Sequence, residues 1–167
     1  PIRNASTMRS FFRTLEEQRV RSVLIGARVA ALHGASTFSE DVDLWVDPTR
    51  ANWRRILDAL ESSSASVYKL TPPLEPEFAR RGHGFHFTIP ADNSSELAAY
   101  LDVMGRPPRV GSFRACSRRA RIFATNWGRL PVLSPADLVL VKRTRRLSDY
   151  AVISALVRLV VADRARS

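Results

Sequence analysis

The sequence has a single cysteine and no long apolar run, so it lacks the features needed for disulfides, cysteine-based zinc sites or membrane spans. Its one cysteine, Cys116, excludes an internal disulfide and a cysteine-based zinc site. No apolar run approaches the ~20 residues that cross a bilayer, so we expect no membrane partner. No charged-then-apolar export segment opens the chain, although a start at Pro1 suggests that the natural N-terminus is missing. We expect a reducing cytoplasm as the simplest location.

Lysine is also scarce. Of 26 basic residues, only Lys69 and Lys142 are lysines. A chain this biased towards arginine keeps a lysine where a compact ammonium group on a flexible stem is needed, as against a nucleotide phosphate. Chance is the alternative. Lys142 is therefore a candidate phosphate-binding residue.

Acidic residues are rare in the second half of the chain. Residues 106–146 carry eleven basic side chains against one acid, Asp137, whereas the chain before Ser62 is nearly balanced, with nine basic and eight acidic residues. Such a run can be simply a solvated face. Together with a net charge of +10, it also suits nucleic acid or the phosphates of a nucleotide. The candidate nucleic-acid-binding residues are Arg114, Arg118, Arg119, Arg121, Arg143, Arg145 and Arg146.

Hydrophobic periodicity predicts an α/β (α+β) fold in a single domain, residues 1–167. Helical spacing and helix-start residues predict helices over 6–20, 29–32, from Asp47-Pro48 through Leu60, and 134–164. Alternation and short apolar runs predict strands at 23–25, 42–46, 67–70, 85–89, 98–104, 120–125 and 130–133, with 71–84 as a loop. This order predicts a mixed sheet core (1–133) with a helical C-terminal end (134–167).

Three carboxylates are candidate metal ligands. Asp41 and Asp43 lie two residues apart on a predicted strand, so both side chains leave the same face. They repel each other unless a cation lies between them, and Mg²⁺ prefers oxygen ligands. Asp102 interrupts an apolar strand, where an acid is unfavourable unless paired or liganding. Each could instead simply face solvent.

A turn and two polar residues near these acids could bind phosphate. Gly26 ends an apolar run and opens a short helix, which places backbone amides where a triphosphate could bind. Arg28 lies in that turn, and Ser39 lies just before the acidic pair. An ordinary turn and a surface cation are the alternatives. His83 and His86 show no third metal ligand, so His86 is interpreted as a strand residue.

Two segments resemble known motifs. Residues 23–44, from Val-Leu-Ile-Gly-Ala-Arg through His-Gly to Asp-Val-Asp-Leu, resemble the opening motif of the nucleotidyltransferase superfamily, and most closely its bacterial AbiEii-like and MenT-like toxin branch. Residues 133–142, Leu-Ser-Pro-Ala-Asp-Leu-Val-Leu-Val-Lys, followed by Arg146-Leu-Ser-Asp149, resemble a later helix of that branch. Ala27 and Thr37 depart from the pattern, which often has Gly or Ser and Arg there.

The resemblance implies a nucleotidyltransferase fold and a metal-dependent transfer of a nucleoside monophosphate from a nucleoside triphosphate to an acceptor hydroxyl. It implies Asp41, Asp43 and Asp102 as catalytic ligands of two Mg²⁺ (or Mn²⁺) ions. It implies a nucleotide site formed by Gly26, Ala27, Arg28, Ser39 and Lys142. The strongly basic latter half makes RNA, especially a tRNA end, a reasonable acceptor, while a protein side chain or a small molecule remains open. Resemblance to the toxin branch also implies an antitoxin protein as a candidate partner.

Three other functions remain open on the same fold. The chain could be a non-catalytic, basic nucleic-acid-binding relative. It could be an interaction protein, such as a toxin-neutralising subunit, whose arginines face an acidic partner. It could also be a phosphotransferase that moves the terminal phosphate instead of the nucleotide.

Overall fold

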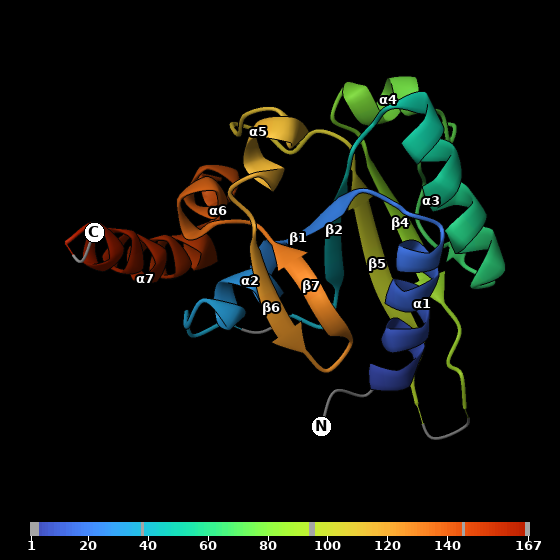
Figure 1. Ribbon diagram of the computed structural model, residues 1–167, viewed down its shortest axis with the longest axis horizontal. Helices are drawn as coiled ribbons and strands as arrows, with labels where there is room; N and C mark the ends of the chain where they lie inside the picture. The colour runs from blue at the N-terminus through green and yellow to red at the C-terminus, as the bar shows by residue number, and fades with distance from the viewer. Residues whose placement is uncertain (1–3, 38, 94–95, 145, 166–167) are drawn as a thin grey trace.

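The computed structural model describes residues 4–37, 39–93, 96–144 and 146–165. Its centre is a seven-stranded mixed sheet with strand order β3-β4-β5-β2-β1-β7-β6 (Figure 1). The strands are β1 (Ser22–Ile25), β2 (Val42–Val46), β3 (Ser66–Val67), β4 (Gly84–Ile89), β5 (Ala99–Met104), β6 (Arg121–Thr125) and β7 (Gly128–Val132). The helices are α1 (Ala5–Glu17), α2 (Gly26–Leu32), α3 (Arg50–Ser62), α4 (Pro76–Arg80), α5 (Phe113–Ser117), α6 (Pro135–Lys142) and α7 (Leu147–Arg164). The predicted mixed α/β architecture with terminal helices is confirmed.

Two strand pairs in the centre of the sheet are parallel, β2 with β5 and β1 with β7. The remaining neighbours are antiparallel, including the β4–β5 hairpin that the sequence predicts. The parallel pairing of β2 with β5 joins segments almost sixty residues apart in the chain. This pairing brings the two acid-bearing strands side by side.

One face of the sheet forms the main core. Leu44 on β2 packs near Phe12 and Leu15 of α1, and Trp53 of α3 lies 5.0 Å from the ring of Phe85 on β4. These large apolar side chains are buried, which removes them from water and stabilises the layer of α1 and α3 on this face. Because side chains alternate along a strand, the residues between them point to the opposite face.

The opposite face carries the polar residues of the central strands. In Figure 1, α2, α5, α6 and α7 lie on the other side of the sheet from α1 and α3. Helix α6 contacts both α2 and α7. Ser134 caps α6 by accepting a hydrogen bond from the Asp137 amide at 3.2 Å, which confirms the helix start predicted there. Within the described residues, no helix combines the length and apolar character needed to cross a membrane.

Three local predictions were wrong, and one short helix was not predicted. The segment 71–84 contains helix α4, because Pro76 occupies the first helical turn, where proline is tolerated, instead of continuing a loop. Helix α3 is not capped by Asp47 but begins at Arg50 after Thr49; Asp47 instead accepts a hydrogen bond from the Thr49 amide and pairs with an arginine. The strand expected at 67–70 is reduced to β3, and the short helix α5 was not predicted.

Candidate functional site

Two of the three predicted acids lie directly opposite each other in the sheet. Asp43 on β2 is the register partner of Asp102 on the parallel strand β5, and such neighbouring strands are about 4.8 Å apart. Burial raises the pKa of Asp43 to about 6; repulsion from Asp102 and Asp41 adds to this shift, and Lys142 and Arg146 oppose it. Tertiary structure therefore brings residues from β2, β5, α6 and the start of α7 to one place.

The pair of carboxylates fits a hard divalent cation. Mg²⁺ is usually held by one or two carboxylates, with water and substrate phosphates completing its ligands. Burial, and after it repulsion from Asp102, raises the pKa of Asp43, and a bound cation would favour the charged form of both carboxylates. Within the part of the chain that the structure describes, no three His, Cys, Asp or Glu side chains gather into a ready metal-binding group. Asp41 as a third ligand remains a prediction.

Gly26 lies against the Asp43 carboxylate. Its φ is +82°, and a Cβ atom placed on it would lie 1.9 Å from Asp43 Oδ2 and 2.8 Å from Asp43 Cβ. Glycine is therefore required both by the backbone conformation and by the close approach of β2. Ala27 follows in the first turn of α2. The turn between β1 and α2 thus adjoins the carboxylate pair, as the sequence motif predicts.

Arg28 and Ser39 bind the loop that carries Asp41. The Arg28 guanidinium donates to the backbone oxygens of Glu40 at 2.8 Å and Asp41 at 3.1 Å, and the Ser39 hydroxyl donates to the Asp41 oxygen at 3.3 Å. Burial lowers the pKa of Arg28, while Asp41, Glu40 and Asp43 offset part of the shift. Both residues also line a cavity of about 420 Å³ beside Trp127. In this geometry, they fix the acidic loop.

Lys142 is held close to the acids by Asp149. Its Nζ lies 3.0 Å from Asp149 Oδ1, and the Thr144 hydroxyl donates to the other carboxylate oxygen. Burial tends to raise the pKa of Asp149, but the hydrogen bonds from Thr144 and Lys142 bring it below its usual value. Because Lys142 also lowers the pKa of Asp43, its ammonium group acts electrostatically on the candidate site.

The sequence pattern did not single out His86 as a partner of Asp102. A hydrogen bond of 2.6 Å joins His86 Nδ1 and Asp102 Oδ1, and the two residues are opposite each other in the β4–β5 pair. The alternation of Phe85, Phe87 and Ile89 places His86 on the face opposite the core, which was readable from the sequence. The register that pairs it with Asp102 was not.

The predicted nucleic-acid-binding arginines fall into two groups. Arg119 binds the carboxylate of Asp137 through two nitrogens, at 2.7 and 3.1 Å, and Arg121 pairs with Asp163 at 2.7 Å. Arg119 and Arg121 are nevertheless exposed, as are Arg114, Arg118, Arg143 and Arg146. Arg145 lies outside the described residues. Part of the basic stretch therefore also serves internal ion pairs.

Replacing Asp43 with Asn is expected to stabilise the protein at pH 8. The carboxyl has a pKa of about 6 when folded, against an ordinary value of 3.8. The folded state thus holds this proton more tightly, and stability falls as pH rises from about 4 to about 6. Above that range Asp43→Asn should raise the free energy of unfolding by about 2–3 kcal/mol, and near pH 4 it should change little.

The measurement is urea unfolding of wild type and Asp43→Asn at pH 4 and pH 8. Asp58→Asn, at an exposed position of α3, is the matched control and should show no such pH-dependent difference. Equal stability of wild type and Asp43→Asn at pH 8 would show that burial and nearby acids do not make the charged Asp43 side chain unfavourable. Added Mg²⁺ should reduce the difference in unfolding free energy between the two proteins at pH 8, because it should stabilise the wild type.

The site combines a glycine turn that opens a short helix, Asp43 on the strand beside it, and Asp102 on the parallel neighbouring strand. This arrangement, on a mixed sheet flanked by helices, is the nucleotidyltransferase fold. Comparison with solved structures supports the assignment of fold. No protein-family profile matches the chain, and no curated protein matches it.

The similar solved structures include the following three. An antigenic nucleotidyltransferase-like protein from Paracoccidioides brasiliensis superposes with a TM-score of 0.57 at 11% identity, over 94% of this chain and 76% of that one. The lincosamide antibiotic adenylyltransferase LnuA, bound to lincomycin, gives 0.56 at 13%, over 89% and 92%. JHP933 from Helicobacter pylori gives 0.53 at 15%, over 93% and 65%. At these identities the likeness shows the fold, and the toxin branch remains a prediction.

Proposed function

We propose that this protein is a metal-dependent nucleotidyltransferase, which transfers a nucleoside monophosphate from a nucleoside triphosphate to an acceptor hydroxyl and releases pyrophosphate. The observation that carries the proposal is the register of Asp43 against Asp102, with the Gly26 turn in contact with Asp43. The adenylyltransferase LnuA, which shares the fold, supports this reaction class.

Each residue near the carboxylates has a part in this proposal. Asp43 and Asp102, together with Asp41, would hold two Mg²⁺ (or Mn²⁺) ions, which would supply Lewis acidity and neutralise phosphate charge. His86 orients the Asp102 carboxylate through its hydrogen bond. Lys142, positioned by its ion pair at 3.0 Å, offsets negative charge on the leaving pyrophosphate. The protein thus contributes alignment and electrostatics, and no covalent intermediate is needed.

The turn and the acidic loop define where the nucleotide lies. The absence of a side chain at Gly26 lets backbone amides of the turn, including that of Ala27, approach the triphosphate. Arg28 and Ser39 hold the backbone of the loop at Asp41. They therefore act on the nucleotide through the position of that loop.

RNA, in particular a tRNA end, is the acceptor that we favour, because exposed arginines from the basic stretch lie around the C-terminal half of the chain. The resemblance to the AbiEii-like and MenT-like branch further suggests a toxin with an antitoxin partner. A phosphotransferase on the same fold would use the same acids. The products distinguish the two reactions: nucleotidyl transfer releases pyrophosphate, whereas transfer of the terminal phosphate releases a nucleoside diphosphate.

The test is incubation of the protein with each α-labelled nucleoside triphosphate, Mg²⁺ and total cellular RNA. We expect label to move onto RNA with stoichiometric pyrophosphate, and to stop when the metal is chelated. Nucleoside diphosphate as the product would indicate the phosphotransferase. RNA retention without any transfer to RNA, protein or small molecules would indicate a non-catalytic binding protein.

A further inference from the structure

A second concave surface lies at the far end of β2 from Asp43. It is a cavity of about 950 Å³ bounded by the end of β2, the segment that leaves β5 and helix α5. Trp45 forms its floor, with the indole nitrogen donating to the Gly105 oxygen at 3.0 Å, and Phe113 packs edge-on against Trp45 at 5.5 Å. We call this surface the arginine cavity. The residues of the candidate active site do not line it.

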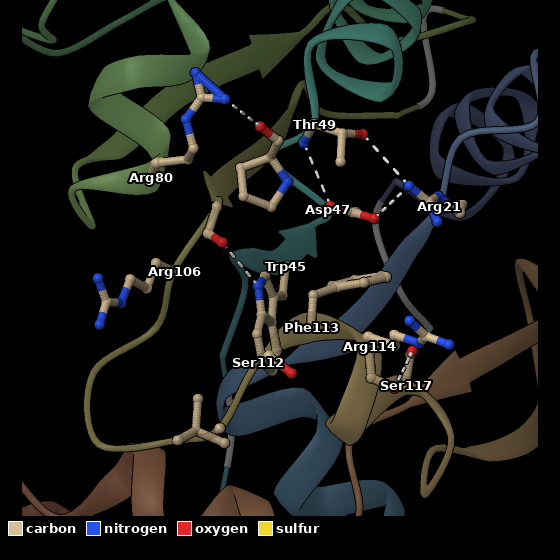
Figure 2. Close-up of a pocket in the computed structure, with 14 residues that line it drawn as sticks. Arg21, Trp45, Asp47, Thr49, Arg80, Arg106, Ser112, Phe113, Arg114 and Ser117 are labelled. Atoms are coloured by element: carbon tan, nitrogen blue, oxygen red, sulfur yellow. Dashed lines mark hydrogen bonds and ion pairs between the residues drawn. The ribbon is translucent and has the colours of Figure 1, made fainter.

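Four arginines surround this cavity. Figure 2 shows Arg80 and Arg106 on one side and Arg21 and Arg114 on the other, with Trp45 and Phe113 between them. One acid, Asp47, is among the lining residues. Positive side chains therefore outnumber negative ones around the arginine cavity, and its arginines are spread around the rim instead of converging on a single point.

Two of the four guanidinium groups are committed to internal partners. Arg21 pairs with Asp47 and donates to the Thr49 hydroxyl, and Arg80 binds the Glu77 carboxylate at 2.7 Å. Arg106 and Arg114 are exposed and their guanidinium groups make no hydrogen bond or ion pair with another residue in the described part of the chain. These two positive charges suit an anionic ligand, and guanidinium groups bind phosphate through charge-assisted hydrogen bonds.

The arginine cavity and the carboxylate pair share one face of the sheet. Asp43, Trp45 and Asp47 alternate along β2 and point the same way. Asp47 directly follows β2 and is four positions after Asp43, which corresponds to about 13 Å in extended chain. Arg106 is four positions after Asp102, in the bend that follows β5. A chain molecule whose end reacts at the carboxylates can therefore reach this cavity with its next phosphates.

We propose that the arginine cavity binds the backbone of a single-stranded RNA acceptor upstream of its reacting end. This proposal rests on the proposed nucleotidyltransferase function. The half-buried ring of Phe113 offers a surface on which a base stacks, and stacking beside a basic groove is how single strands are held without sequence preference. A rim of separated arginines matches successive phosphates better than it matches one small anion. Arg106 and Arg114 both belong to the basic stretch of residues 106–146.

The test measures the affinity of the full chain for a fluorescent single-stranded oligoribonucleotide of about 12 nucleotides. The Arg106→Ala/Arg114→Ala variant should bind it roughly tenfold more weakly than wild type, and its log Kd against log salt slope should be shallower by about 1.4, for two phosphate contacts. The matched control is Arg13→Ala/Arg54→Ala, which removes the same charge from exposed positions on α1 and α3, over the opposite face. This control should bind RNA within about threefold of wild type.

Three results would overturn the proposal: equal weakening by both double variants, no RNA binding by wild type, or equal loss with a duplex of the same sequence. Binding of Mg²⁺–ATP, measured by calorimetry on the same proteins, separates this inference from the proposed function. Unchanged Mg²⁺–ATP binding with lost RNA affinity supports the arginine cavity as an acceptor site. Selective RNA loss from a protein that neither binds Mg²⁺–ATP nor transfers label supports the RNA site and refutes the proposed enzyme.

Discussion

Nucleotide transfer is expected to fall on the order of 10³-fold in Asp43→Asn and in Asp102→Asn, with the fold intact. Each substitution keeps the shape of the side chain and removes the negative charge that a divalent cation requires. The two residues are register partners on β2 and β5, so the effects of the two substitutions on the rate should be non-additive. The double variant should be little less active than either single variant. The rate of label transfer under saturating triphosphate measures this effect.

The control for this experiment is Asp58→Asn on α3, which should retain the wild-type rate. RNA affinity, measured in parallel, should be unchanged or slightly higher in Asp43→Asn, because a negative charge is removed. If both Asp variants kept more than about a tenth of the activity, a loss far below the 10³-fold expected, the carboxylate pair could not be the catalytic centre. Loss of RNA affinity together with activity would instead point to a folding defect.

Gly26→Ala is expected to abolish activity and to lower the free energy of unfolding by about 3–4 kcal/mol. The substitution forces a left-handed backbone conformation on alanine, which costs about 1 kcal/mol, and overlaps Asp43, which adds about 2–3 kcal/mol. Rotation of the Asp43 side chain does not relieve the overlap, because the new methyl group would also lie 2.8 Å from Asp43 Cβ. Denaturant unfolding and label transfer on the same preparation measure both effects.

Gly34→Ala is a matched control within the same segment. Gly34 has a φ of +97°, but a Cβ atom there meets nothing within 4 Å. The free energy of unfolding of Gly34→Ala should fall by about 1 kcal/mol from backbone strain alone. Its activity per folded molecule should equal that of the wild type. The difference between the two glycine variants isolates the contact with Asp43. Equal destabilisation by both would show that the approach of Gly26 to Asp43 has no energetic importance.

The sequence predicted secondary structure best where residue type and hydrophobic periodicity indicated the same element. The alternation of Asp41 to Val46 correctly indicated β2, and the apolar run ending at Gly26 correctly indicated β1 and a turn into a helix. The pattern failed at 71–84, where adjacent prolines suggested a loop and a short helix formed after Glu75. Proline marks a helix start as readily as a loop, and the sequence alone offers no way to choose.

The roles of individual polar residues were harder to predict than their position. Arg28 and Ser39 lie next to the site as expected, but their hydrogen bonds go to backbone oxygens of the Asp41 loop. Arg119 was predicted to bind nucleic acid and holds Asp137. The sequence shows that an arginine is present, but the fold determines which acid lies close enough to pair with it.

By itself, the sequence determined the α/β class, the acids of β2 and β5, the glycine turn and the basic second half of the chain. These features are local, because strand alternation, turn chemistry and charge depend on neighbouring residues. Tertiary structure alone decided that Asp102 faces Asp43, that His86 binds Asp102, and that Arg21, Arg80, Arg106 and Arg114 surround one cavity. Those contacts depend on which distant strands pair and in which register. A shift of one residue in the register would turn the side chains of a strand to the opposite face of the sheet.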